Sequence, residues 1–153
     1  MATPEACRHL LTSMEGITGV HRSLAKALPA GCLPPGSGVL FVLGRSEQPL
    51  RAGRVAELMD IDMSVVSRHI AHLVDQGRVA RSPNPHDGRS CLLGLTDQGR
   101  AVVDNATEQC LDVVAGGLRD WPDEDIERLA DLLERLRVSL GHRTLPAPEP
   151  VPH

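Results

Sequence analysis

The feature that most constrains this chain is a pair of short helical segments joined by a three-residue turn. The first segment, residues 52–59, places its apolar residues on one side. A turn at residues 60–62 leads to a second segment, residues 63–76, and Gly77 follows where a left-handed residue commonly ends a helix. Two helices joined by so short a turn, the second ending in glycine, are typical of a helix-turn-helix.

Two short apolar segments follow the second helix and flank a loop rich in Pro, Asn, Asp and Gly. The segments cover residues 79–81 and 91–95, and the loop covers residues 82–90. This pattern predicts a β-hairpin with a long tip. Thr96 can then cap a further helix, which we expect over residues 97–118. The predicted fold class is therefore mainly α with a small β-hairpin wing.

Helical periodicity gives the 63–76 segment two different faces. Val66, Ile70 and Leu73 fall on one face, at about 100° per residue, and are expected to pack on the preceding helices. The other side carries short or polar side chains, at Ser64, Val65, Ser67, Arg68, His69 and His72. Such a face fits the DNA major groove, about 12 Å wide, where an arginine can bond guanine O6 and N7. The alternative is an ordinary solvent-exposed face, against which the neighbouring turn and hairpin argue.

The hairpin loop supplies a second candidate contact with DNA. Its tip, with Asp87, Gly88 and Arg89, can lie along the minor groove, whose negative potential attracts arginine. Alternatively, Asp87 and Arg89 pair only with each other and shape the loop. Both interpretations can hold, because a carboxylate can orient an arginine that also contacts DNA. Arg81 and His86 complete the residues of the hairpin that we expect at DNA.

The stretch from the first of these helices to the one after the hairpin resembles the MarR family of bacterial regulators. The motifs keep the family's order and spacing over roughly residues 36–140. They are V-A-E-L, S-x-V-S-R, L-x-x-x-G, R-x-P-x-P-x-D-x-R-S and L-T-x-x-G-R. Carried over by position, the matches to the recognition helix and the wing are Ser64, Ser67, Arg68, Asp87 and Arg89.

The resemblance implies a winged helix-turn-helix with N- and C-terminal dimerisation helices. It implies a homodimer that binds double-stranded DNA at a pseudo-palindromic operator, expected to repress transcription and to be released by a small-molecule effector. The chain departs from the family at Gly88, where a second arginine is common, so the minor-groove contact is weaker or rests on Arg89 alone. His69 and His72 also replace the more usual aliphatic and basic residues.

Further helices are predicted on both sides of the helix-turn-helix. Apolar spacing predicts a helix over residues 4–28 and another to about residue 140, with Pro122 in its first turn. The apolar segment 39–43 is interpreted as a buried helix. The resulting boundaries are 1–35 for an N-terminal dimerisation helix and linker, 36–100 for the DNA-binding domain, 101–141 for C-terminal dimerisation helices and 142–153 for a Pro-rich disordered tail.

Composition narrows the classes of function. The net charge is −4, but residues 101–153 hold 11 of the 20 acidic groups. Residues 64–90 are mildly basic, a local balance that is compatible with DNA binding. Phe41 and Trp121 are the only aromatic residues, which argues against base stacking on single-stranded nucleic acid. Motifs of phosphate-binding loops and hydrolases are missing, so no enzyme is predicted. With no secretion signal and no apolar run of about 20 residues, we expect a cytoplasmic protein.

Three alternatives remain open. An oxidant sensor needs an accessible cysteine of low pKa, for which Cys7 is the best-placed residue, although inert thiols are expected. A zinc-responsive regulator needs three or four converging ligands, which Cys7, His9, His21 and Cys32 supply only if a dimer assembles them. No metal or cofactor is therefore predicted. A winged helix that binds only proteins is the third alternative, against which the basic residues of the predicted DNA face argue.

Overall fold

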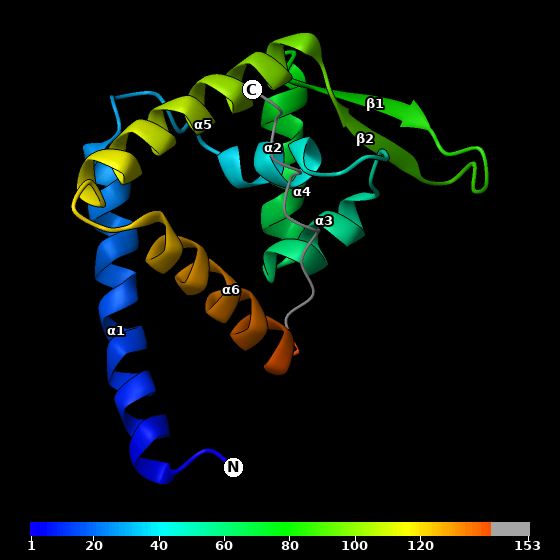
Figure 1. Cartoon of the computed structure of the whole chain (residues 1–153). Coiled ribbons are helices and arrows are strands. Elements are labelled where there is room, and N and C mark those ends of the chain that lie inside the picture. The colour runs from blue at the N-terminus through cyan, green and yellow to red at the C-terminus, as the bar shows by residue number, and fades with distance from the viewer. Residues whose placement is uncertain (142–153) are drawn as a thin grey trace.

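A computed structural model describes residues 1–141, in which six helices and one two-stranded antiparallel sheet follow one another (Figure 1). In chain order they are α1 (Pro4–Ala27), α2 (Ser37–Gly44), α3 (Ala52–Met59), α4 (Met63–Asp75), β1 (Val79–Pro83), β2 (Cys91–Leu95), α5 (Asp97–Gly117) and α6 (Asp123–Ser139). The mainly helical class with a hairpin wing is confirmed. The tail predicted over 142–153 lies outside the described residues. No helix within residues 1–141 is long and apolar enough to span a membrane.

The ends of the helices follow from a few local interactions. Thr96 caps α5 as predicted, because its hydroxyl accepts a hydrogen bond from the Gly99 N–H at 3.0 Å. Gly77, just behind α4, has φ +70°, the left-handed value expected of a residue that ends a helix. The start of α6 differs from the prediction: the helix begins at Asp123, and Pro122 is its N-cap residue. The φ of −69° at Pro122 suits extended backbone as well as a helix, so proline alone does not fix this boundary.

One apolar core joins α2, α3, α4 and the hairpin. Its largest fully buried side chains are Leu40, Ile70, Leu73, Leu93, Val39, Val55 and Val66. The segment 39–43 therefore lies in a buried helix, as interpreted from the sequence. Leu50 adds a backbone link, since its N–H and C=O both bond Leu93, at 3.0 and 2.8 Å. Each buried Leu or Ile side chain contributes about 1.5–3 kcal/mol, and together they fix α4 relative to the hairpin.

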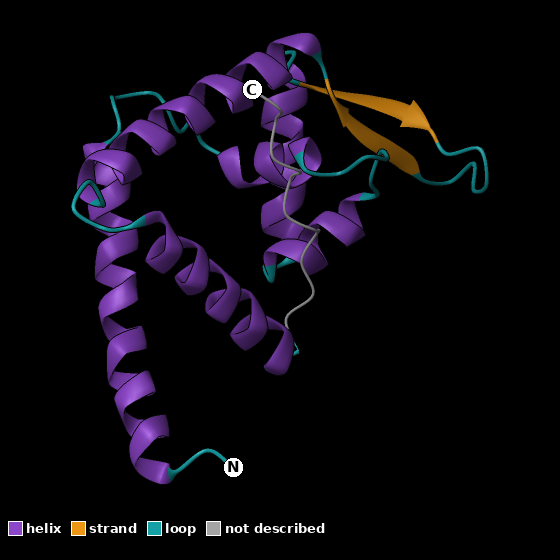
Figure 2. Ribbon diagram, viewed as in Figure 1, coloured by secondary structure: helices purple, strands orange, loops and turns teal. Residues whose placement is uncertain are grey.

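The hairpin projects from the helical lobe (Figure 2). Its register runs from Val79 opposite Leu95 to Pro83 opposite Cys91. β1 is two residues longer than predicted, because Pro83 is tolerated at the last position of an edge strand. Val79 is buried at the base of the hairpin, whereas the rest of β1 is exposed. The hairpin is thus anchored at its base and free at its tip.

Within the described residues, neither α1 nor α6 contains a buried side chain. Figure 1 shows both helices running downward from the end of α5 that meets α1, with α6 running diagonally to a point below the lobe that carries the hairpin. A small second core, formed by Leu28, Cys32 and Ala106, joins the end of α1 to α5. The large exposed apolar side chains of the two helices include Leu10, Leu11, Ile17, Val20, Leu129, Leu132, Leu133 and Val138. An apolar surface of this extent usually marks an interaction site.

Candidate nucleic-acid interface

α4 has one face in the core and one in solvent. The exposed fractions of Val66, Ile70 and Leu73 are 0%, 2% and 0%, which confirms the inner face predicted for this helix. The side chains of the opposite face are exposed at Ser64, Ser67, Arg68 and His72. The core therefore holds α4 so that its short and polar side chains point outward.

Arg68 is the basic residue at the centre of this outer face. Within residues 1–141 its guanidinium makes no hydrogen bond or ion pair. A free guanidinium keeps all five N–H donors, in a planar fork that suits two parallel bonds to one acceptor edge. Ser64 and Ser67 flank it one turn or less away and add small hydroxyl groups.

Two other residues predicted to contact DNA, Val65 and His69, are half-buried. Val65 lines an open groove between α3 and α4. His69 packs on the chain just before α2, since its Nδ1 is 3.3 Å from the point that a Cβ on Gly36 would occupy. Gly36 has φ +82°, so the close approach and the left-handed backbone both favour glycine there. His69 remains a predicted contact, with one side of its ring against the protein.

The tip of the hairpin is held by Asn84, a residue that the sequence analysis did not single out. Asn84 is only 5% exposed, although it lies in a loop. Its Nδ2 donates to the Ser90 hydroxyl at 2.9 Å, and its Oδ1 accepts from the His86 N–H at 3.0 Å. A buried amide with both ends bonded fixes the loop that carries the predicted DNA contacts. Asn in a turn is so common that no sequence signal distinguishes this one.

Asp87 shapes the loop without neutralising Arg89. Its Oδ1 accepts a hydrogen bond from the backbone N–H of Arg89 at 3.1 Å. Its Oδ2 lies 4.0 Å from the guanidinium of Arg51, a long and exposed pair that contributes little. Within the described part of the chain, the guanidinium of Arg89 has no partner. The structure therefore shows no ion pair between the side chains of Asp87 and Arg89, which was the alternative considered from the sequence.

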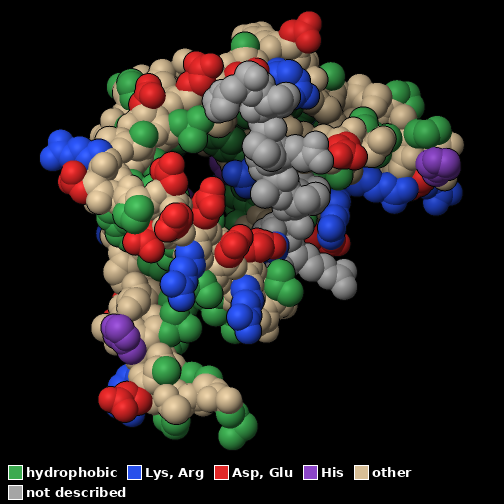
Figure 3. Space-filling view, viewed as in Figure 1, with side chains coloured by type: hydrophobic (Ala, Val, Ile, Leu, Met, Phe, Trp, Pro, Cys, Tyr) green, Lys and Arg blue, Asp and Glu red, His purple; other side chains and the backbone are tan. Residues whose placement is uncertain are grey.

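Charge is distributed unevenly over the surface. Figure 3 shows basic side chains along the underside of the hairpin and a histidine at its tip, whereas acidic side chains gather over α6. Arg81, His86 and Gly88 are all exposed on the hairpin, and within residues 1–141 Arg81 forms no ion pair. Acidic and basic residues are thus concentrated in different parts of the surface, and the hairpin carries positive charge although the net charge of the chain is −4.

The four cysteines lie in different environments. Cys7 and Cys91 are exposed, Cys32 is buried and Cys110 is half-buried. Burial, and to a lesser degree the neighbouring Cys32, raises the pKa of the Cys110 thiol, which keeps it protonated and weakly nucleophilic. Within residues 1–141, no three His, Cys, Asp or Glu side chains are placed to hold a metal ion. The zinc set considered from the sequence is therefore not assembled inside one chain.

α3 and α4 form a helix-turn-helix in which α4 has an exposed outer face, and a hairpin with a basic edge follows. This arrangement defines a winged helix-turn-helix protein. Comparison with known proteins shows which winged helix-turn-helix proteins the chain is similar to. A model described as MarR family matches residues 34–90. The chain is 31% identical over 84 residues to the "Uncharacterized HTH-type transcriptional regulator YdgJ" of Bacillus subtilis (strain 168), across 55% of this chain and 51% of YdgJ. It thus spans about half the length of that relative.

Two further likenesses cover more of the chain. The HTH-type transcriptional regulator TcaR of Staphylococcus aureus (strain Newman) is 27% identical over 114 residues, across 70% of this chain and 74% of TcaR. The fold is similar to that of the PcaV transcriptional regulator from Streptomyces coelicolor, with TM-score 0.68 and 23% identity over 92% of this chain and 99% of PcaV. Residues 34–90, which run from the segment before α2 to the end of the wing loop, thus match the MarR family, and the relatives YdgJ and TcaR are both described as HTH-type transcriptional regulators.

Proposed function

We propose that this protein is a sequence-specific repressor that binds a pseudo-palindromic site in double-stranded DNA as a homodimer. The observation that carries the proposal is the outer face of α4, where an unpaired Arg68 stands between small hydroxyl side chains while the core fixes the inner face. A helix of this shape fits the major groove, and the arginine fork matches guanine O6 and N7. Ser64 and Ser67 bond phosphates or base edges, Val65 contacts a thymine methyl group and His72 faces the backbone.

The hairpin acts as the second contact of each subunit. Arg89 enters the minor groove beside the site of α4, where a narrow groove concentrates negative potential. Gly88 supplies no charge, so this contact depends on Arg89, with Arg81 and His86 toward the phosphates. Asn84 keeps the loop in one shape, which lowers the ordering cost when DNA binds.

The homodimer is supported by the exposed apolar residues of α1 and α6. Side chains such as Leu11, Val20 and Leu132 are 63%, 67% and 52% exposed, and burying them against a second copy stabilises the pair. A two-fold dimer presents two α4 helices in opposite orientations. Its site is then a pseudo-palindrome whose half-sites lie about one helical turn apart.

A small ligand is proposed to release the dimer from DNA. PcaV, whose fold this chain shares, was crystallised in complex with its natural ligand. A ligand that changes the spacing of the two α4 helices weakens both half-sites together. The effect is limited by the difference in ligand affinity between the two shapes of the dimer.

The test is selection of bound fragments from the source genome by the purified protein, repeated with the double variant Arg68→Ala/Arg89→Ala. We expect the wild type to enrich a palindromic site and the double variant to enrich none. Arg119→Ala, which removes an exposed arginine of the turn between α5 and α6, outside the proposed DNA-contacting residues, is the matched control and should enrich the same site. If a folded wild-type dimer enriches nothing at low salt, the proposal fails and a winged helix that binds proteins is favoured.

A further inference from the structure

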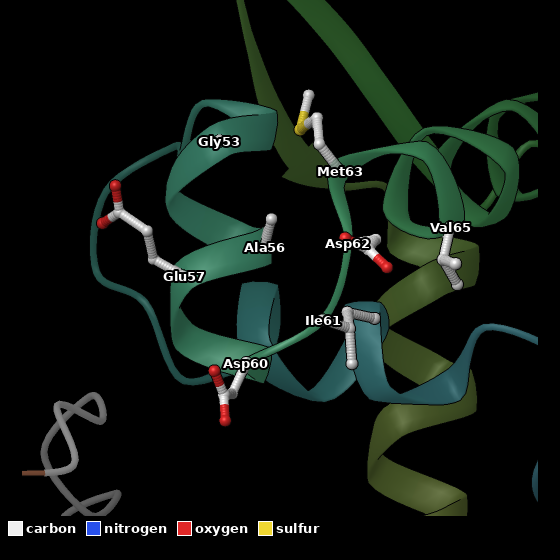
Figure 4. Close-up of a pocket in the computed structure, with 8 residues that line it drawn as sticks. All are labelled: Gly53, Ala56, Glu57, Asp60, Ile61, Asp62, Met63 and Val65. Carbon is white, nitrogen blue, oxygen red and sulfur yellow. The ribbon is translucent and has the colours of Figure 1, made fainter.

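An open groove lies between α3 and the start of α4, on the outer side of the helix-turn-helix (Figure 4). Its volume is about 760 Å³, within the range of about 300–1,000 Å³ that small-molecule sites occupy. In Figure 4, Ala56 and Ile61 lie between the two helices, with Met63 at one edge of the groove and Val65 at another. Ile61 is 36% exposed and Met63 is 47% exposed. The groove thus presents apolar side chains that remain exposed among the described residues 1–141.

The charged residues that line this groove are all acidic. They are Glu57, Asp60 and Asp62, and no Lys, Arg or His lines it. Glu57 is paired with Arg54 at 2.9 Å, but within residues 1–141 the carboxylates of Asp60 and Asp62 have no hydrogen bond or ion pair. Asp62 is the N-cap residue of α4, yet its side chain makes no capping bond. The carboxylates of Asp60 and Asp62 therefore take no part in the hydrogen bonds that fix the turn, which are made by the backbone groups of these residues.

We infer that this groove binds an amphipathic organic cation, and that the bound cation and DNA exclude each other. The inference rests on the proposed function and assigns an effector class and a site to it. The argument is complementarity: an apolar body covers Ile61 and Met63, while a positive centre lies within reach of Asp60 and Asp62. Attraction between such charges falls as salt rises, whereas the apolar contact does not.

Other occupants fit the groove less well. A hydrated Mg²⁺ or Ca²⁺ requires several oxygen ligands and gains nothing from exposed Ile61 and Met63. An organic anion and a DNA phosphate are both repelled by the two unpaired carboxylates. An uncharged apolar molecule can contact Ile61 and Met63 but leaves the carboxylates of the groove without a partner. A cation with an apolar body satisfies both parts of the lining.

The location of the groove connects it with DNA binding. Val65 and Met63 line it and belong to the first turn of α4, the part of the helix proposed to enter the major groove. A molecule seated there covers Val65 and adds bulk where the helix approaches the bases. Mutual exclusion is reciprocal, so DNA must weaken cation binding by the same factor.

The experiment is isothermal titration calorimetry of the full chain without DNA, using three probes of similar shape. They are tetraphenylphosphonium, the uncharged triphenylphosphine oxide and the anion tetraphenylborate. We expect only tetraphenylphosphonium to bind. Asp60→Asn/Asp62→Asn should weaken it at least about fivefold, because one charge pair at about 4 Å in water is worth about 1 kcal/mol. Asn tolerates the left-handed backbone at residue 60, where φ is +52°, so the variant should fold.

Asp112→Asn is the matched control, since it removes an exposed carboxylate of α5 away from the groove, and it should bind the cation as the wild type does. Equal binding of the uncharged probe, no binding of the cation, or equal weakening by the control would each overturn the inference.

Fluorescence anisotropy with labelled DNA then tests whether the bound cation and DNA exclude each other. Saturating tetraphenylphosphonium should raise the Kd for DNA about tenfold in the wild type and much less in the double Asn variant. Unchanged DNA affinity with a filled groove would overturn the exclusion, and failure to bind any DNA at all would instead refute the proposed function.

Discussion

Replacing Gly99 with alanine tests the contact between α5 and the hairpin, which sets the position of the wing. A Cβ on Gly99 would lie 2.0 Å from the carbonyl oxygen of Arg78 and 3.0 Å from its carbonyl carbon. Both atoms belong to the backbone, so no side-chain rotation relieves the overlap. Since ordinary van der Waals contact begins at 3.4 Å, the start of β1 must move away from α5 by more than an ångström.

The cost of this movement can be worked out from the bonds that it breaks. The N–H of Thr96 donates to the Arg78 carbonyl at 3.1 Å, and the Thr96 hydroxyl donates to the Gly77 carbonyl at 2.6 Å. Each bond is worth about 1 kcal/mol, and overpacking adds about 1–3 kcal/mol. Alanine recovers about 1 kcal/mol of helix propensity. We therefore expect Gly99→Ala to lower the free energy of unfolding by about 2–4 kcal/mol.

Urea unfolding followed by far-UV circular dichroism measures this change, at one protein concentration because the stability of a dimer depends on concentration. Gly53→Ala is the matched control in α3, since a Cβ there meets nothing within 4 Å. It should leave stability unchanged or raise it by up to about 1 kcal/mol. If Gly99→Ala is within about 0.5 kcal/mol of the wild type, the reasoning about this contact is refuted.

Three further predictions concern the wing, the dimer and the thiols. Asn84→Ala removes the two hydrogen bonds that shape the wing tip, so DNA affinity measured by anisotropy should fall while far-UV dichroism stays the same; unchanged affinity would contradict it. Leu133→Glu places a charge on the exposed apolar face of α6 and should give a monomer by light scattering, whereas a persistent dimer would remove this face from the interface. Because its pKa is raised, Cys110 should react with iodoacetamide more slowly than the exposed Cys7 at about pH 8, and equal rates by peptide mass spectrometry would refute this.

The helix-turn-helix could be predicted closely because its signals are local. Apolar spacing in residues 63–76 identified Val66, Ile70 and Leu73 as the inner face, and all three are buried. Gly77 marked the end of α4 because its left-handed backbone is a property of that residue and its immediate neighbours. The same local logic placed the cap of α5 at Thr96.

The features that sequence reasoning missed depend on packing between distant segments. Asn84 is buried because the loop folds over it, and nothing in the local pattern separates this asparagine from an exposed one. The need for glycine at position 99 comes from the carbonyl of Arg78, which the fold of the hairpin brings against α5. The groove between α3 and α4 likewise exists only once the two helices are packed. His69 was placed on the outer face by its helical position, but its ring packs on the chain before α2.

The measurement that most directly tests recognition of DNA by α4 is the affinity of Arg68→Ala and Arg89→Ala for a selected site. It uses a set of DNA fragments in which each carries one changed base pair. We expect Arg68→Ala to lose about 1–3 kcal/mol on the parent site and to lose discrimination at one base pair of each half-site. Arg89→Ala should weaken binding to all fragments by a similar factor. Equal, sequence-independent losses in both variants would contradict the assignment of α4 to the major groove and of the wing to the minor groove.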